Sequence, residues 1–494
     1  MTRWQICFAG SVLSALLLAS LFPPLSLEAL APAALTPLLF AMAREPDGRR
    51  RFLWSWLCGF LYWLLVCHWI RDTLAAFGGL NGPLSWLAVI LFAVAKGLHT
   101  AAFGWLAGMV VNRAWAIPAV AALWTGIERT HGPLGFAWLT LGNAGISLPL
   151  PLRAAPLLGV YGLSFIFAAL ACGLTLATLK RDRRQLAWLL ALPLLWLLPP
   201  PQANSQPGEQ AVAMQTNIPG DFTWTVEEKD RAIRHLSVMT LAEALEPSRA
   251  KPSLVLWPEA PAPFYFYEDS DFRLRASEVA RLSSAPFVLA GVTYTASRQP
   301  LNSALLLGPR GQLSGRYDKA RLVPFGEFVP AGFRWIEKIS SEAGDYVPGP
   351  GAKVLIAGGH TLGVFICYES AFPDYVRQFT ASGAEVLVNL TNDGYYGSSA
   401  ARGQHLLLAR MRAVENGRWL LRPSNDGVTA SIDPAGRVWD RLPEYQRVAG
   451  RLRFAWERAL TPYTRFGDWF AWLCLAAGLA AAAAAQIPSY RRDR

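Results

Sequence analysis

Three side chains in the second half of the chain have the chemistry that acyl transfer requires. Cys367 ends the apolar run Leu362–Ile366 and is the only cysteine between residues 201 and 460. Glu259 follows the apolar residues Val255–Trp257, and Lys319 lies in a stretch bounded by glycine and proline. Acyl transfer needs a thiolate, a base that takes its proton, and a cation that stabilises the oxyanion. These three residue types supply that set.

Each of these residues also has an ordinary interpretation. A lone cysteine is a buried thiol, an intermolecular bridge or a nucleophile, and unpaired cysteine is among the most buried residue types. A glutamate after a strand is usually a solvated turn residue, and a lysine in a loop usually lies at the surface. The combination of the three, and no single one of them, indicates a catalytic site.

The stretch 201–460 alternates apolar strands with amphipathic helices, which predicts a layered α/β fold. The predicted strands cover 211–217, 253–257, 286–294, 302–308, 362–367, 385–390 and 427–432, and the predicted helices cover 226–246, 271–283, 373–382 and 401–417. The candidate residues then lie at strand ends or in loops, where sites are usually built.

The rest of the chain has the composition of a membrane protein. Of the 494 residues, 53% are hydrophobic and only 16% are charged, against about 25% charged in soluble domains. A membrane-spanning helix needs about 20 apolar residues, and eight candidate runs cover 5–21, 24–43, 52–71, 85–110, 114–130, 155–179, 186–200 and 468–487. We expect a seven-helix bundle over 1–200, a catalytic domain over 201–460, and an eighth helix with a cytoplasmic tail within 461–494.

Basic residues predict how these runs are oriented. They lie near the ends of the runs and are Arg3, Arg44, Arg49, Arg50, Arg51, Arg113, Lys180, Arg181, Arg183, Arg184, Arg491, Arg492 and Arg494. With eight spans they all fall on one side, which should be cytoplasmic, so the stretch 201–460 faces the other side. The net charge of +11 is largely explained by these loops, and no basic stretch resembles a nucleic-acid groove.

Charged residues within the apolar runs are usually functional or paired. We expect Glu128 and Arg129 to sit at the membrane interface in contact with water. Lys96 is expected to reach the interface or to pair with a carboxylate or a lipid phosphate.

The remaining polar residues carry weaker signals. The six histidines show no close ligand spacing, so no metal site is predicted. His405 is expected to start or line a helix. Asn302-Ser303 and Asn425-Asp426-Gly427 are interpreted as turn signals.

Three motifs resemble a known superfamily in combination. They are Trp257-Pro258-Glu259, the run from Lys319 to Glu327, and Cys367-Tyr368-Glu369. They resemble the nitrilase, or carbon–nitrogen hydrolase, superfamily. With the predicted bundle in front, the whole chain resembles the apolipoprotein N-acyltransferase family. The resemblance implies an α-helical membrane bundle that carries an αββα sandwich, without a cofactor.

The resemblance also implies roles for the three candidates and their neighbours. Glu259 would be the general base, Lys319 would stabilise the oxyanion, and Cys367 would be the nucleophile. Supporting roles would fall to Glu327, Tyr368 and Glu369. The backbone N–H of Tyr368 is a plausible second oxyanion donor.

Aromatic residues near these motifs are candidates for substrate contact. The resemblance places Trp224 near the substrate. The family usually has Asn-Asp-Ala-Trp-Phe-Gly where this chain has Asn392-Asp393-Gly394-Tyr395-Tyr396-Gly397, so Tyr395 replaces a tryptophan. A mobile lid for lipid entry is predicted, with an ordinary hydrophobic core as the alternative; its candidate residues are Phe264, Tyr265, Phe266, Tyr267, Phe333, Trp335 and Ile336.

The implied reaction is a ping-pong transfer of an acyl chain in a bacterial inner membrane. A glycerophospholipid would acylate Cys367, and the α-amine of a diacylglyceryl-cysteine at an apolipoprotein N-terminus would then take the acyl chain. The catalytic domain would face the periplasm, and the protein would act as a monomer. Two alternatives stay open at this point: a membrane-tethered amidase for a small exported substrate, and a transporter with a degenerate domain.

Overall fold

The computed structural model describes residues 2–134, 136–219, 224–259, 265–329 and 346–487. The chain forms two compact units. The helical unit comprises 1–71, 82–200 and 466–494, and the α/β unit comprises 72–81 and 201–465. Residues 72–81, which the sequence analysis assigned to the bundle, therefore group with the α/β unit.

The α/β unit contains two six-stranded sheets. The first has the order β12-β1-β2-β3-β4-β5, with β1 (Glu209–Gln215), β2 (Leu254–Leu256), β3 (Phe287–Tyr294), β4 (Pro300–Leu307), β5 (Leu313–Asp318) and β12 (Val448–Phe454). The second has the order β11-β10-β9-β8-β7-β6, with β6 (Leu355–Ala357), β7 (His360–Ile366), β8 (Val386–Leu390), β9 (Leu420–Arg422), β10 (Ala430–Ile432) and β11 (Val438–Arg441).

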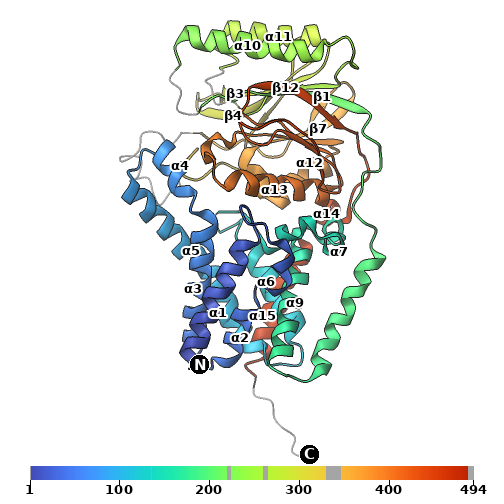
Figure 1. The fold of residues 1–494 in the computed structure, drawn as a ribbon. Helices are drawn as coiled ribbons and strands as arrows, with labels where there is room; N and C mark the ends of the chain where they lie inside the picture. The colour runs from blue at the N-terminus through green and yellow to red at the C-terminus, as the bar shows by residue number, and fades with distance from the viewer. Residues whose placement is uncertain (1, 135, 220–223, 260–264, 330–345, 488–494) are drawn as a thin grey trace, which may run out of the picture. The chain divides into compact units, whose positions relative to one another are not determined.

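Two pairs of helices cover the outer faces of these sheets (Figure 1). The first sheet contacts α10 (Val226–Ala244) and α11 (Ser270–Ser283). The second contacts α12 (Pro373–Ala381) and α13 (Ala401–Asn416). This arrangement confirms the predicted αββα sandwich.

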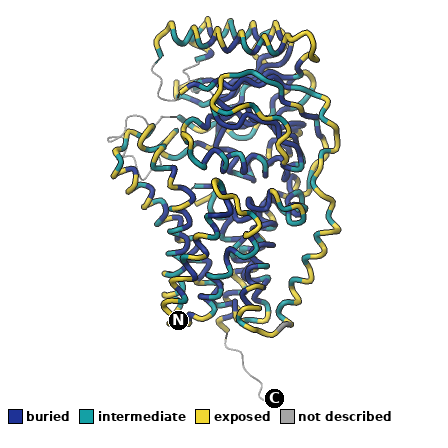
Figure 2. Tube along the Cα trace, viewed as in Figure 1, coloured by how far each residue is buried: buried dark blue, intermediate teal, exposed yellow. Residues whose placement is uncertain are grey.

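Alternation along the strands builds two hydrophobic cores. In β1, Ala211 and Ala213 join the core that contains the second sheet, whereas Val212 and Met214 join the core beneath α10 and α11. Successive side chains of a strand point to opposite faces, so one strand serves both layers. Figure 2 shows the central strands as mostly buried, and exposed residues recurring along α10 and α11.

All seven predicted strands and all four predicted helices of this unit are present, but five strands were missed. Four of these, β5, β6, β11 and β12, are the edge strands of the two sheets. Edge strands expose polar and charged side chains, which weakens the apolar signal; in β11 no residue is buried. The fifth, β9, has only three residues.

The helical unit has fewer long helices than the eight predicted spans. Three helices are long and apolar enough to cross a membrane: α1 (Arg3–Ser20), α5 (Gly82–Val110) and α9 (Val160–Thr178). A fourth span is possible if α3 (Gly48–Cys67) and α4 (Ile70–Phe77), which are bent by 52°, count as one. The predicted count of eight is therefore not supported by the described helices.

The other predicted spans form shorter or broken elements. They are η1 (Glu28–Ala33), α2 (Thr36–Arg44), α6 (Ala116–Arg129), η3 (Arg183–Leu197) and α15 (Trp469–Ala484), while the single turn α8 (Ala155–Leu158) precedes α9 within the span predicted over 155–179. Pro32 lies inside η1 and Pro193 lies inside η3. Proline removes a backbone donor and clashes with the preceding turn, so hydrophobicity alone overestimates the helix length here. Short elements η2 (Leu141–Ser147) and α7 (Pro149–Leu152) complete this part, and α14 (Pro462–Phe466) precedes α15.

Three charged residues within the predicted spans, Lys96, Glu128 and Arg129, are buried and have partners inside the protein. The Lys96 ammonium contacts His131 Nδ1 at 2.9 Å, donates to the Phe136 carbonyl at 3.0 Å, and lies 4.5 Å from the centre of the Trp63 ring. Lys96 is buried, and its contacts among the described residues are a histidine, a carbonyl and an aromatic ring rather than a carboxylate. Hydrogen-bond acceptors inside the protein satisfy the ammonium better than a purely apolar environment would.

Glu128 and Arg129 are also buried rather than in contact with water. Glu128 accepts hydrogen bonds from the Leu141 amide at 2.6 Å and the Ser164 hydroxyl at 2.5 Å. Arg129 forms an ion pair with Asp468 at 2.5 Å. These contacts join α6 to η2, α9 and the segment before α15.

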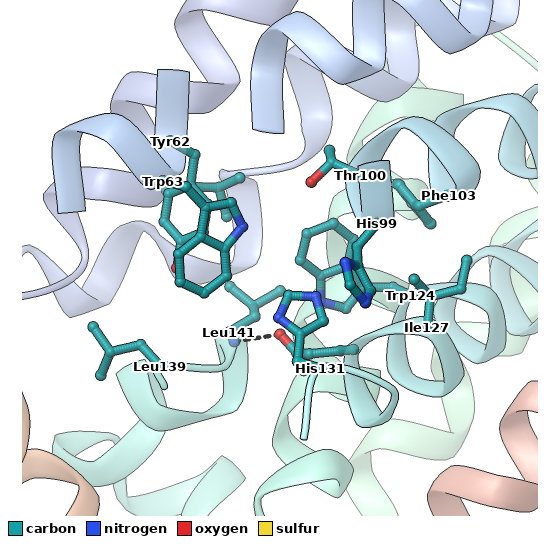
Figure 3. Close-up of a pocket in the computed structure, with 12 residues that line it drawn as sticks. Tyr62, Trp63, His99, Thr100, Phe103, Trp124, Ile127, His131, Leu139 and Leu141 are labelled. Atoms are coloured by element: carbon teal, nitrogen blue, oxygen red, sulfur yellow. Dashed lines mark hydrogen bonds between the residues drawn. The ribbon is translucent and has the colours of Figure 1, made fainter. Parts of the chain in front are cut away.

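A small cavity lined by apolar and aromatic side chains, with His99, His131 and Glu128 among them, lies in this part of the unit (Figure 3). His99 and His131 lie next to each other in its lining, with ring centres 4.1 Å apart. The cavity has a volume of about 20 Å³, and a cavity needs about 10–15 Å³ to hold one water molecule. The cavity is large enough for water, not for a lipid head group.

Candidate active site

The structure brings Glu259, Lys319 and Cys367 together from three different strands. Glu259 follows β2, Lys319 follows β5, and Cys367 follows β7. All three side chains are buried. The Lys319 Nζ atom lies 3.3 Å from Glu259 Oε1. The three residues that the sequence singled out thus form one cluster between the sheets.

Cys367 marks a sharp change in chain direction. It directly follows β7, begins the short helix η5 (Cys367–Ala371), and has a φ of +50°. Only glycine adopts this left-handed region readily, and other residues lose roughly 1–3 kcal/mol there. Surrounding contacts must hold the residue in place, and its carbonyl accepts a hydrogen bond from His405 Nε2 at 3.1 Å.

Burial sets the resting protonation state of the nucleophile. It raises the pKa of the Cys367 thiol well above its usual value, and the Glu259 charge raises it further, while Lys319 opposes both. The resting residue is therefore a thiol, and a base must accept its proton when it reacts. Glu259 is the carboxylate with the largest effect on this thiol.

Lys319 is charged in spite of its burial. Burial alone would lower the pKa of its ammonium, but Glu259 and Glu327 hold that pKa well above the ordinary value. Lys319 Nζ lies 2.8 Å from Glu327 Oε1, closer than the 3.3 Å to Glu259. A fixed cation in a water-poor site can stabilise a negative oxygen.

Asn302 connects the two glutamates, a role that the sequence analysis missed. Its side-chain amide donates to Glu259 Oε1 and Glu327 Oε1, both at 2.9 Å. The turn interpretation is wrong, because Asn302 lies inside β4 and pairs with Val292 of β3. The available signal was a polar pair, Asn302 and Ser303, inside a strand whose other residues are apolar.

Backbone amides complete the hydrogen bonding of the two glutamates. The Asn392 amide donates to Glu259 Oε2 at 3.1 Å, and the Val323 amide donates to Glu327 Oε2 at 2.8 Å. Both carboxylates are therefore fixed in orientation, with one oxygen of each directed at Lys319.

Glu369 ties the loop of Lys319 to the loop of Cys367. Its carboxylate accepts hydrogen bonds from the Tyr317 hydroxyl at 2.6 Å and from the backbone amides of Ala320 and Ile366, both at 2.8 Å. Burial raises the pKa of Glu369, and these hydrogen bonds act against that rise. Glu369 is two residues from the nucleophile and acts as an anchor for both loops.

The predicted substrate-contact residues lie in different environments. Trp224 is half-buried and packs against the core beneath α10 and α11. Tyr395 is 41% exposed. Its ring lies 5.1 Å from that of Phe77, and its carbonyl accepts a hydrogen bond from Thr73. Residues 72–81 thus cover Tyr395 within the α/β unit.

Phe266 lies in a hydrophobic core, as the alternative to the lid prediction expects. Its side chain is 3% exposed and belongs to the core beneath α10 and α11, and a role in a mobile lid stays a prediction. Tyr267 next to it is 46% exposed. The candidates Phe264, Phe333, Trp335 and Ile336 lie outside the described residues.

Within the described part of the chain, no group of three or more histidine, cysteine, aspartate or glutamate side chains could hold a metal ion. The chemistry derived below uses only the side chains and backbone groups of the site.

Comparisons with known proteins cover both units. Residues 14–173 match the family model "Apolipoprotein N-acyltransferase N-terminal domain", and residues 211–449 match "Carbon-nitrogen hydrolase". An apolipoprotein N-acyltransferase from Geobacter metallireducens is 32% identical, over 96% of this chain and 94% of that protein. The chain belongs to the apolipoprotein N-acyltransferase family. Another family member, from Azotobacter vinelandii, is also 32% identical, over 90% of this chain and 88% of its own length.

Among solved structures, a variant of an amidase from Nesterenkonia AN1, of the nitrilase superfamily, is similar to part of the chain. It is 22% identical, with a TM-score of 0.39, and the match covers 53% of this chain and 95% of that one.

Proposed function

We propose that this family member transfers an acyl chain from a glycerophospholipid, through a thioester on Cys367, to the N-terminal amine of diacylglyceryl apolipoproteins. The observation that carries the proposal is the buried cluster of Glu259, Lys319 and Cys367, in which a thiol lies with a carboxylate and a permanent cation. Matches of both units to one family support the combination of a helical unit with this site.

The first half-reaction forms the thioester. Glu259 accepts the Cys367 proton, and the thiolate attacks the carbonyl carbon of the phospholipid ester. The negative charge on the former carbonyl oxygen is stabilised by Lys319 and by the Tyr368 N–H. When the carbon–oxygen bond of the ester breaks, Glu259 returns the proton to the leaving lysophospholipid oxygen.

The second half-reaction transfers the acyl chain to nitrogen. The neutral α-amine of the diacylglyceryl-cysteine attacks the thioester carbonyl, and Glu259 accepts a proton from this nitrogen. The tetrahedral intermediate collapses with cleavage of the carbon–sulfur bond. The proton passes to the departing sulfur, which restores the Cys367 thiol and leaves an amide.

Location follows from the substrates. Both are lipids, so an enzyme anchored in their bilayer holds them at high local concentration and limits their orientation. We propose a monomer in a bacterial inner membrane, with a bundle over 1–200, a periplasmic catalytic domain over 201–460, and a final helix within 461–494. The apolar helices α1, α5 and α9 support a membrane location.

Other interpretations of the chain account for less of it. Paired buried charges such as Arg129 with Asp468, and the bend between α3 and α4, also occur in transporters. A transporter has no need for an assembled acyl-transfer site. An amidase for small substrates would share the site and has no need for lipid acceptors, so the acceptor decides between the two.

The test is capture of the thioester by the full-length protein. The purified enzyme is incubated with phospholipid, and intact mass is measured with and without a diacylglyceryl-cysteine peptide. We expect a mass increase of one acyl group on the wild type and none on Cys367→Ser. When the peptide is added, the wild type should lose this acyl group and the peptide should gain it. Release of the acyl chain only to water would favour the amidase, and no adduct on the wild type would reject the proposal.

A further inference from the structure

A chain of buried side chains holds the carbonyl group of Cys367. His405 Nε2 lies 3.1 Å from this oxygen, and His405 Nδ1 lies 2.8 Å from Asp393 Oδ1. Arg422 donates to both carboxylate oxygens of Asp393 at 2.9 Å. A carbonyl oxygen can only accept a hydrogen bond, so Nε2 of His405 carries a proton. The mechanism above uses none of His405, Asp393 and Arg422.

The histidine ring is fixed from three elements. His405 lies on α13, Asp393 begins η6 (Asp393–Tyr396), and Arg422 ends β9. All three side chains are fully buried. Burial alone would raise the pKa of Asp393, but Arg422 and His405 hold it far below the ordinary value, so Asp393 is charged. The Asp393 carboxylate and Arg422 Nη2, 2.8 Å and 3.0 Å from His405 Nδ1, fix the plane of the ring.

The geometry of the peptide bond connects His405 to catalysis. The Cys367 carbonyl and the Tyr368 N–H belong to one planar trans peptide and point in opposite directions. A hydrogen bond that fixes the oxygen therefore fixes the direction of the N–H. The same bond also polarises the peptide and strengthens the N–H as a donor.

We infer that His405 is a positioning residue for acylation, which holds the Cys367 carbonyl so that the Tyr368 N–H points at the developing oxyanion. The inference rests on the proposed function, in which this N–H stabilises the tetrahedral intermediate. The left-handed backbone of Cys367 is consistent with it, because such a conformation persists only where neighbours over-determine it.

Two substitutions of His405 separate this role from a merely structural one. His405→Gln keeps an N–H donor near the position of Nε2, so it preserves the bond to Cys367. His405→Asn keeps a donor only near the position of Nδ1, towards Asp393, and loses that bond. Both substitutions keep a polar side chain of similar or smaller size, and thermal melting reports whether each variant folds.

Two reactions of Cys367 are measured on each full-length variant. The first is acylation, by phospholipid and by the small activated ester p-nitrophenyl butyrate, in single turnover. The second is alkylation by iodoacetamide, measured on the peptide that contains Cys367. Alkylation requires the thiolate but forms no oxyanion. A loss of oxyanion stabilisation therefore slows acylation only.

For His405→Asn we expect acylation to slow by about tenfold to hundredfold and alkylation to stay unchanged. This loss is smaller than the factor of about 10²–10³ for removal of a whole oxyanion donor. His405→Gln should keep most of the acylation rate. An acylation rate of the His405→Asn variant equal to that of the wild type would overturn the inference. A parallel loss of acylation and alkylation that His405→Gln does not rescue would also overturn it.

A second variant keeps the test decisive if His405→Asn does not fold. Asp393→Asn leaves the Nε2 donor of His405 in place but holds the ring less firmly, so it should slow acylation and leave alkylation unchanged. Acylation at the wild-type rate would count against the inference. The donor proposal is tested separately. If the wild type accepts the activated ester but not phospholipid, the proposed donor is wrong, while the comparison on the activated ester still decides the role of His405.

Discussion

Replacing Lys319 with methionine separates its catalytic role from its role in stability. At an effective dielectric constant of about 20, its ion pairs at 3.3 Å with Glu259 and 2.8 Å with Glu327 are each worth about 5–6 kcal/mol before desolvation. Removing one partner of a buried ion pair costs about 3–5 kcal/mol, because it leaves charge uncompensated. Loss of an oxyanion donor slows acylation by about 10²–10³. We therefore expect Lys319→Met to lose both stability and rate.

The double variant Lys319→Met with Glu327→Gln tells the two effects apart. Removing one carboxylate together with the ammonium restores the charge balance of the site, so part of the lost thermal stability should return. Acylation should not return, since no cation faces the oxyanion. Thermal melting and single-turnover acylation of the wild type, the single variant and the double variant are compared. Recovery of the acylation rate in step with stability would refute an oxyanion role for Lys319.

Three further changes test other parts of the site. Glu259→Gln keeps the shape of the side chain but accepts no proton. The rates of thioester formation and of its discharge by the amine should therefore both fall by a factor of about 10²–10⁴. A normal discharge rate in a stopped-flow assay would limit the role of Glu259 to the first step. Burial raises the pKa of Cys367, so the rate of its alkylation by iodoacetamide should keep rising with pH beyond about 8.5, where the rate of an ordinary thiol levels off. A plateau of the rate near that pH would show an activated resting thiolate. Phe266→Ala should lower the free energy of unfolding by about 3–5 kcal/mol and slow acyl transfer from long-chain and short-chain donors equally. The exposed control Tyr267→Ala should melt at the wild-type temperature. A loss of rate with bilayer phospholipid alone would support the lid interpretation.

The sequence predicted the residues that carry the chemistry because their signals are local. Cys367 and Glu259 each end a continuous apolar run, and such runs become the central strands β7 and β2. Edge strands were missed because their exposed faces dilute the same signal. Apolar composition also predicted spans where the structure has short or broken helices, and in η1 and η3 a proline lies inside the element.

The partners of these residues could not be predicted, since they come from distant positions. Asn302 meets Glu327 across 25 residues and Glu259 across 43. His405 meets Cys367 across 38 residues. Nothing in the local sequence distinguishes such a histidine from one that merely lines a helix. The same holds for Lys96, whose acceptors lie on a segment that the topology folds back into the helical unit.

The pairing of one lysine with two glutamates explains how a buried thiol can react at all. Before proton transfer the site holds two carboxylates and one ammonium. After transfer it holds a thiolate, one carboxylate and the same ammonium, so the net charge is unchanged. Creating a lone buried thiolate would carry a large desolvation cost. Moving the negative charge from Glu259 to Cys367, both of which interact with Lys319, avoids that cost. Glu327 then keeps Lys319 in place while Glu259 is neutral, because its own contact with Nζ is the shorter of the two.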